Sequence, residues 1–137
     1  MEYVLQFTDP MASIVKIFNT HFMEFCEDIS KVFPDNKDIQ KVKFGIEVLQ
    51  KTKPKIMIEY WKLFSTRYTE EIERGDLDFF VDHDYRHEMN DVQADDSMAS
   101  YIDKFRGPIR DMGEENKEKS VTYIQNLTKM SKMYSSN

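Results

Sequence analysis

Apolar residues recur at alternating spacings of four and three near the start of the chain, which is the repeat of one α-helical face. The series consists of Met11, Val15, Phe18, Phe22, Phe25, Ile29 and Val32. Because an α-helix repeats about every 3.6 residues, all of these side chains lie on a single face. Thr8, Asp9 and Pro10 suit a helix start, and Pro34 ends the pattern. The pattern therefore predicts a helix over 10–33, whose apolar face must be covered by the rest of the chain or by a partner.

Later segments carry similar patterns. The predicted elements are a helix over 36–51 capped by Asp35, a helix over 54–72 that ends at Gly75, a short turn capped by Asp76, a helix returning near Ser97 and a final helix from about Glu114. Phenylalanine is bulky for a two-stranded coiled coil, and the later helices carry matching stripes, so we interpret the first helix as the centre of an intramolecular bundle. The sequence thus predicts an all-α fold, with one domain over 1–137 that is a compact bundle of about five helices.

Two segments fall outside this helical pattern. Residues 1–8 are expected to form an N-terminal arm or an extra turn. Residues 81–97 lose the apolar repeat and are rich in aspartate, so they are predicted to be an acidic loop.

The charge is unevenly distributed along the chain. Residues 37–69 carry a net charge of +5, whereas residues 70–103 carry −10. In one interpretation the acidic and basic segments face each other inside the fold. In the other, the acidic segment is a docking surface for a basic partner. The candidate interaction residues are Asp76, Asp78, Asp82, Asp84, Asp91, Asp95 and Asp96.

Composition limits the classes of function. The net charge of −6 argues against general affinity for nucleic acid or anionic membranes. No apolar run approaches the ~20 residues that a membrane span needs, and the N-terminus lacks the basic region of a secretory signal. Cys26 is the single cysteine and has no partner for an internal disulfide, which favours a reducing compartment.

One cluster has the spacing of metal ligands. His83 and His87 lie one helical turn apart, with Asp84 or Glu88 to complete a set. The cluster lacks the order of a zinc protease motif, and Arg86 lies in its middle. The alternative interpretation is a solvated acidic helix edge.

Other candidate groups have simpler explanations. His21 is expected at the edge of the core, and Cys26 is expected to be a small buried or boundary residue. Lysines 37, 41, 43, 51, 53 and 55 could contact phosphate, but we expect no interleaving of aromatic residues with this patch and therefore a solvated face. No glycine-rich phosphate loop or nucleophile motif occurs, and no cofactor is expected.

The order of several short motifs resembles that of a viral family. The motifs are Val32-Phe33-Pro34-Asp35, the Pro54-led helix to Tyr68, Ile72, the run from Gly75 to Phe80, the run from Glu114 to Lys119, Tyr123, Leu127 and Tyr134. This arrangement resembles small helical proteins of large DNA viruses of algae and protists. The resemblance implies no activity and no catalytic residue. It implies a protein that is not secreted and works in the host cytoplasm or in a virion.

These observations favour a non-enzymatic protein that binds other proteins, such as a minor capsid or virion structural component. The expected partners are capsid or other viral proteins, with nucleic acid and membranes not expected. One alternative is a regulatory or host-factor-binding protein in the infected cell. Another is a metal-binding protein that uses His83 and His87.

Overall fold

The computed structural model describes residues 10–82 and 104–135, and within these ranges the regular structure is helical, without strands. The helices are α1 (Pro10–Val32), α2 (Lys37–Thr52), α3 (Ile56–Arg67), α4 (Thr69–Arg74), α5 (Leu77–Asp82) and α8 (Glu114–Lys132), and residues 104–110 are also helical. The prediction of an all-α fold is confirmed. The predicted arm over 1–8 and most of the predicted loop over 81–97 lie outside the described residues.

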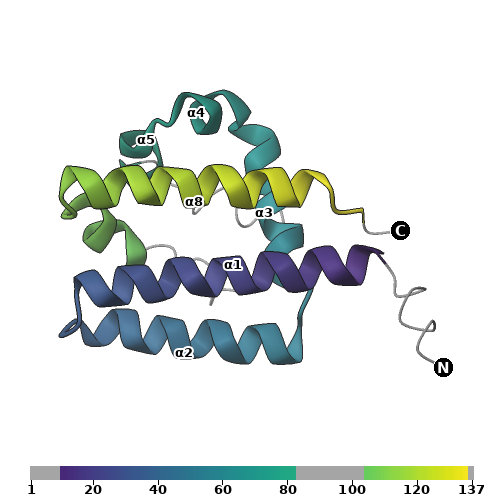
Figure 1. The fold of residues 1–137 in the computed structure, drawn as a ribbon, viewed down its shortest axis with the longest axis horizontal. Helices are drawn as coiled ribbons and strands as arrows, with labels where there is room; N and C mark the ends of the chain where they lie inside the picture. The colour runs from purple at the N-terminus through teal and green to yellow at the C-terminus, as the bar shows by residue number, and fades with distance from the viewer. Residues whose placement is uncertain (1–9, 83–103, 136–137) are drawn as a thin grey trace.

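Helix α1 lies between α2 and α8 (Figure 1). Helices α1 and α8 run in opposite directions, so the start of α1 meets the end of α8, where the backbone amide of Ser135 donates to Met11 Sδ at 3.1 Å. Helix α3 contacts α1, α2 and α8, whereas α4 contacts α3 and α8. Helix α2 therefore lies at the edge of the arrangement, with one side packed on α1 and α3.

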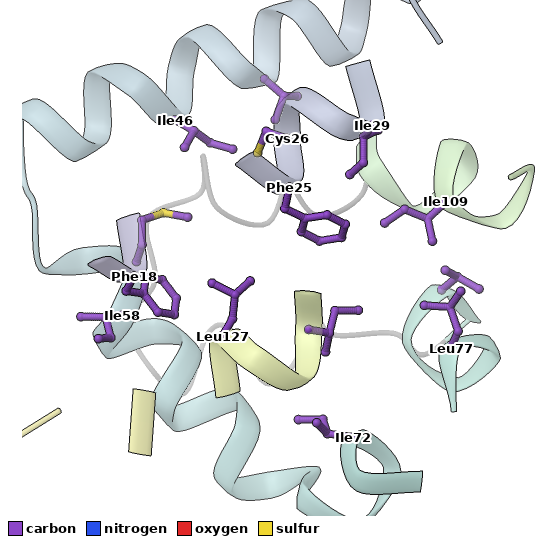
Figure 2. Close-up of a cluster of buried hydrophobic side chains, with 14 of the residues drawn as sticks. Phe18, Phe25, Cys26, Ile29, Ile46, Ile58, Ile72, Leu77, Ile109 and Leu127 are labelled. Atoms are coloured by element: carbon purple, nitrogen blue, oxygen red, sulfur yellow. The ribbon is translucent and has the colours of Figure 1, made fainter. Parts of the chain in front are cut away.

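The apolar face of α1 is covered by the chain itself. Val15, Phe18, Phe25 and Ile29 are buried, and the other members of the stripe are partly buried against the same core. Asn19 and Cys26 are buried as well, so the covered arc is wider than the stripe because α2 packs on one side of α1 and α8 on the other. Phe18, Phe25 and Leu127 meet side chains from α2, α3, α5 and residues 104–110 in one cluster (Figure 2).

Helix α2 begins one residue later than the sequence suggested. The Oδ1 atom of Asn36 accepts a hydrogen bond from the backbone amide of Ile39 at 3.1 Å, so Asn36 is the N-cap in place of Asp35. Asparagine and aspartate cap equally well, so residue type alone does not distinguish the two positions.

The predicted helix over 54–72 is divided at Tyr68, which has φ −123° and ψ 31°. On either side of this break, the hydroxyl groups of Thr66 and Thr69 donate to the carbonyl oxygens of Lys62 and Ser65, at 2.7 and 2.8 Å. Hydroxyls that bond back to carbonyls one turn earlier bend helices. With this division, and with a helix at α5 in place of the predicted turn, the described helical segments number seven, in place of about five.

Gly75 ends α4 as predicted. Its φ of 71° is left-handed, and an added Cβ would lie 3.3 Å from Val121 Cγ1. Asp76 then caps α5 because its Oδ1 accepts from the amide of Phe79 at 3.1 Å. Since Leu77 and Val81 are buried, α5 continues to Asp82, and the first two positions of the predicted loop over 81–97 are helical.

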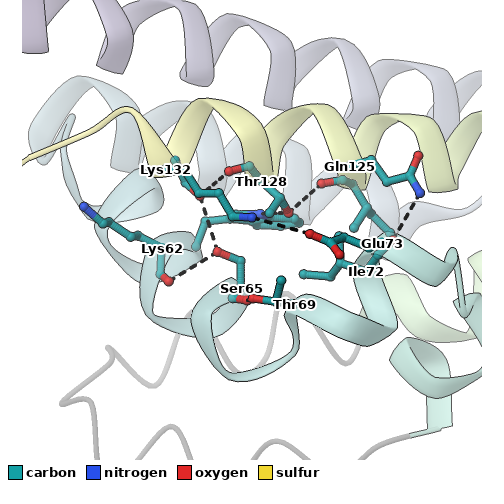
Figure 3. A network of polar contacts seen from close by, with 11 residues as sticks. Lys62, Ser65, Thr69, Ile72, Glu73, Gln125, Thr128 and Lys132 are labelled. Atoms are coloured by element: carbon teal, nitrogen blue, oxygen red, sulfur yellow. Dashed lines mark hydrogen bonds and ion pairs between the residues drawn. The ribbon is translucent and has the colours of Figure 1, made fainter.

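Helices α3 and α8 meet along a polar seam (Figure 3). Trp61 Nε1 donates to Thr128 Oγ1 at 3.0 Å, and the buried hydroxyls of Ser65 and Ser131 lie 3.4 Å apart. Small side chains allow the two helices to approach closely, and the hydroxyls are satisfied within the seam. At its end, Lys62 donates to the carbonyl oxygen of Tyr134.

Candidate functional site

Three of the seven predicted acidic docking residues are described, and two of them have local partners. Asp76 caps α5 and lies 3.2 Å from Arg74, and the bonds from the Phe79 amide and from Arg74 lower the pKa of its carboxyl group. Asp82 pairs with Arg110 at 2.7 Å, and Arg110 also donates to the carbonyl oxygen of Val81. These two carboxylates hold α5 in place.

Asp78 is exposed on α5. The other predicted docking residues, Asp84, Asp91, Asp95 and Asp96, lie outside the described residues. The predicted metal ligands His83, Asp84, His87 and Glu88 also lie outside them. Within ranges 10–82 and 104–135, no three His, Cys, Asp or Glu residues are grouped to hold a metal ion.

His21, Tyr123 and Asp28 meet between α1 and α8. Tyr123 donates its phenolic hydrogen to Asp28 Oδ2 at 2.6 Å, and its ring centroid lies 4.8 Å from that of His21. Desolvation and the bond to Asp28 both raise the pKa of Tyr123. The phenol therefore stays protonated at neutral pH and acts as a hydrogen-bond donor that joins two helices.

Cys26 is 1% exposed and lies in the core beneath α2, which confirms its expected burial. Burial is the main cause that raises the pKa of its thiol. Because the thiolate is the nucleophilic form, a buried neutral thiol is a poor nucleophile.

An apolar pocket of about 120 Å³ lies among α1, α3, α5 and residues 104–110. Its lining includes Phe22, Trp61, Phe64, Phe80 and Phe105, all of which pack against the hydrophobic core. Arg106 is the charged member of an otherwise largely apolar lining, and among the described residues no second charged side chain lines the pocket.

The outer face of α2 is the most distinctive exposed surface of the described chain. We define it as Lys37, Lys41, Phe44, Val48 and Lys51, which follow the alternating spacing of four and three on one side of the helix. Phe44 is 68% exposed and Val48 is 44% exposed. The opposite side of the same helix buries Ile39, Val42 and Ile46 in the core.

Other large apolar side chains are exposed, but they are dispersed. Ile17, Leu63 and Met133 lie on or beside three different helices. Single exposed apolar residues are normal on protein surfaces, whereas a group on one face indicates a contact site. In the described ranges, α2 is the helix that exposes two large apolar residues one turn apart.

Sequence reasoning missed this face because it followed only the buried stripe of α2. The outer-face residues form a second series with the same spacing on the other side of the helix, and this series was the signal in the sequence that could have located the face. The structure also corrects the expectation that no aromatic residue lies among the lysines, since Phe44 shares a face with Lys37, Lys41 and Lys51.

Comparison with protein-family models, with curated proteins and with solved structures finds no match to the chain. Of the helices in the described ranges, none has the length and apolar composition to cross a membrane.

Proposed function

We propose that this chain is a non-enzymatic helical protein that binds another protein through the outer face of α2. The observation that carries the proposal is the exposure of Phe44 and Val48 on one helical face. Full burial of a phenylalanine or valine side chain is worth roughly 1.5–3 kcal/mol. A partner that covers both side chains therefore gains a substantial part of the binding free energy of a stable complex. Exposed apolar groups rimmed by polar residues are typical of such contact sites.

The reactive groups that the structure describes support a role without catalysis. The pKa of the Cys26 thiol is raised by burial, and Tyr123 is held protonated by desolvation and by Asp28. Asp76 and Asp82 are occupied in capping and pairing at α5. These groups stabilise the fold, whereas Phe44 and Val48 on the outer face of α2 are exposed to solvent.

The viral resemblance gives the proposal its biological setting. In this setting the protein is a minor capsid or virion component of a large DNA virus, built as a compact bundle around α1. The alternative is a regulatory or host-factor-binding protein of the infected cell. Mass spectrometry of purified particles separates the two, because only the virion component is present in them at a constant ratio to other structural proteins.

Site-specific photo-crosslinking tests the binding role. A photoreactive amino acid replaces Phe44 in one variant and Thr122, an exposed residue of α8, in a matched control. In infected cells we expect a protein adduct at position 44 and none at position 122. Equal adducts at both positions, or none at position 44 in a folded protein, would contradict the proposal.

A further inference from the structure

We propose that the partner of the outer face of α2 is an acidic amphipathic helix from a different protein. This inference rests on the proposed function and adds the chemistry of the partner. The outer face spans 15 residues from Lys37 to Lys51, and the 14 steps between them cover about 21 Å at a rise of 1.5 Å per residue. That length matches about four turns of a helix packed alongside it.

The arrangement of charge on this face favours a partner that carries acidic side chains. Lys37 and Lys41 lie toward the start of α2, Lys51 lies near its end, and the apolar pair is between them. All three lysines are exposed. A partner helix with two apolar residues at its centre and carboxylates on both sides would complement this order.

The acidic residues of α2 offset only part of this charge. Glu47 and Lys51 lie one turn apart and both line the groove between α1 and α2, so Glu47 offsets charge at Lys51. Lys37 and Lys41 lie more than a turn away from Glu47. Asp38 follows Lys37 directly and is therefore turned by about 100° from it. The outer face itself holds three cations and no acid.

A second copy of the chain is a poor occupant. A symmetric contact places the same surface of both copies together, so Lys37, Lys41 and Lys51 would face one another. Like charges opposed at an interface are unfavourable. Two of the three acids at α5, Asp76 and Asp82, are already paired with arginines of their own chain, so a second copy offers Asp78 as the remaining acid there.

Single-stranded nucleic acid is also a poorer fit than a protein helix. Binding of that kind combines cations with successive aromatic platforms for base stacking, and this face has one ring, Phe44, followed by the aliphatic Val48. An aliphatic residue one turn from an aromatic residue suits the apolar stripe of a helix.

A display library of 16-residue helical peptides with randomised surfaces, selected on the whole chain, tests this inference. We expect enriched peptides to be acidic, with apolar residues three or four positions apart. Their affinity should fall at least tenfold with Phe44→Asp and should weaken with added salt. The triple variant Lys37→Glu, Lys41→Glu, Lys51→Glu should select basic peptides instead, whereas the control Lys129→Glu on α8 should select the same peptides as the wild type.

Three results would overturn the inference. They are a library that yields no binder, enriched peptides that are neutral or basic, and binding of a thymidine oligonucleotide that depends on Phe44 and exceeds that of every peptide. All substituted positions are exposed, so circular dichroism should show unchanged folding. If crosslinking at position 44 succeeds while charge reversal has no effect, the binding role stands and the acidic partner is rejected.

Discussion

Tyr123 donates a hydrogen bond of 2.6 Å to Asp28 and so joins the last long helix to the first across 95 positions of sequence. The Tyr123 ring also stacks on Phe25, with centroids 4.9 Å apart and planes inclined by 18°. A bond to a charged acceptor at the edge of an aromatic contact fixes the register between α1 and α8. This register places Leu127 of α8 in the core with Phe18 and Phe25.

Removal of this hydroxyl should weaken the contact between the two helices. Tyr123→Phe keeps the ring and removes the donor, so we expect the free energy of unfolding to fall by about 1–2 kcal/mol. Urea denaturation followed by circular dichroism measures the change. Thr122→Ala, at an exposed neighbour, is the control and should have little effect. If Tyr123→Phe is as stable as the control, the bond does not tie the helices.

Truncation to alanine should lower the stability strongly at one phenylalanine and hardly at all at another. Phe18 is 0% exposed, so Phe18→Ala should cost about 3–5 kcal/mol of stability through lost burial and a cavity. Phe44 is 68% exposed, so Phe44→Ala should change stability by less than about 0.5 kcal/mol. The denaturation midpoints of the two variants measure this contrast. A large loss with Phe44→Ala would show that this ring supports the fold and is not reserved for a partner.

The cap at Asp76 should contribute stability that depends on pH. Its pKa is lowered in the folded state, so the contribution is complete above the unfolded value of about 3.9 and is lost as the pH falls through the folded value. Asp76→Ala should therefore be less stable than wild type at pH 7, and the difference should shrink toward pH 2. Asp76→Asn retains a capping oxygen and should therefore lose less stability at pH 7 than Asp76→Ala does. A difference that is independent of pH would contradict the role of the charge.

Cys26 should react with thiol reagents only when the protein unfolds. Its side chain is 1% exposed and burial raises its pKa, so both access and thiolate formation are suppressed. Native protein mixed with a disulfide reagent at pH 8 should be labelled slowly, and in 8 M urea the same thiol should react at once. Rapid labelling of native protein would contradict the packing of α1 against α2.

Features that depend on a regular apolar repeat or on the chemistry of a single residue at a helix end were predictable from the sequence. The stripe of α1, the left-handed Gly75 and the cap at Asp76 follow from local chemistry, and the structure contains all three. The division at Tyr68 was not predictable, because the apolar spacing continues through it. Hydroxyl-to-carbonyl bonds of Thr66 and Thr69 flank the division, and bonds of this kind bend helices without interrupting the apolar repeat.

The candidate site was harder to predict than the helices. Phe44 and Val48 fit any helical pattern, and their exposure follows from the position of α2 at the edge of the fold with one side packed. Lysines 37, 41 and 51 are spaced as one face in the sequence, but the side of α2 that packs on α1 and α3 is a property of the whole arrangement. Sequence alone therefore located the basic segment without its apolar centre.

A crosslinking scan along α2 tests the central claim most directly. A photoreactive amino acid is placed in turn at positions 38, 41, 44, 48 and 52, all of which are exposed. We predict that protein adducts in infected cells are strongest at positions 41, 44 and 48, which share the outer face. Adducts should be weak at position 38, which is turned by about 120° from Phe44 around the helix. A uniform yield along the helix, or no adduct at positions 44 and 48, would contradict a partner seated on the outer face of α2.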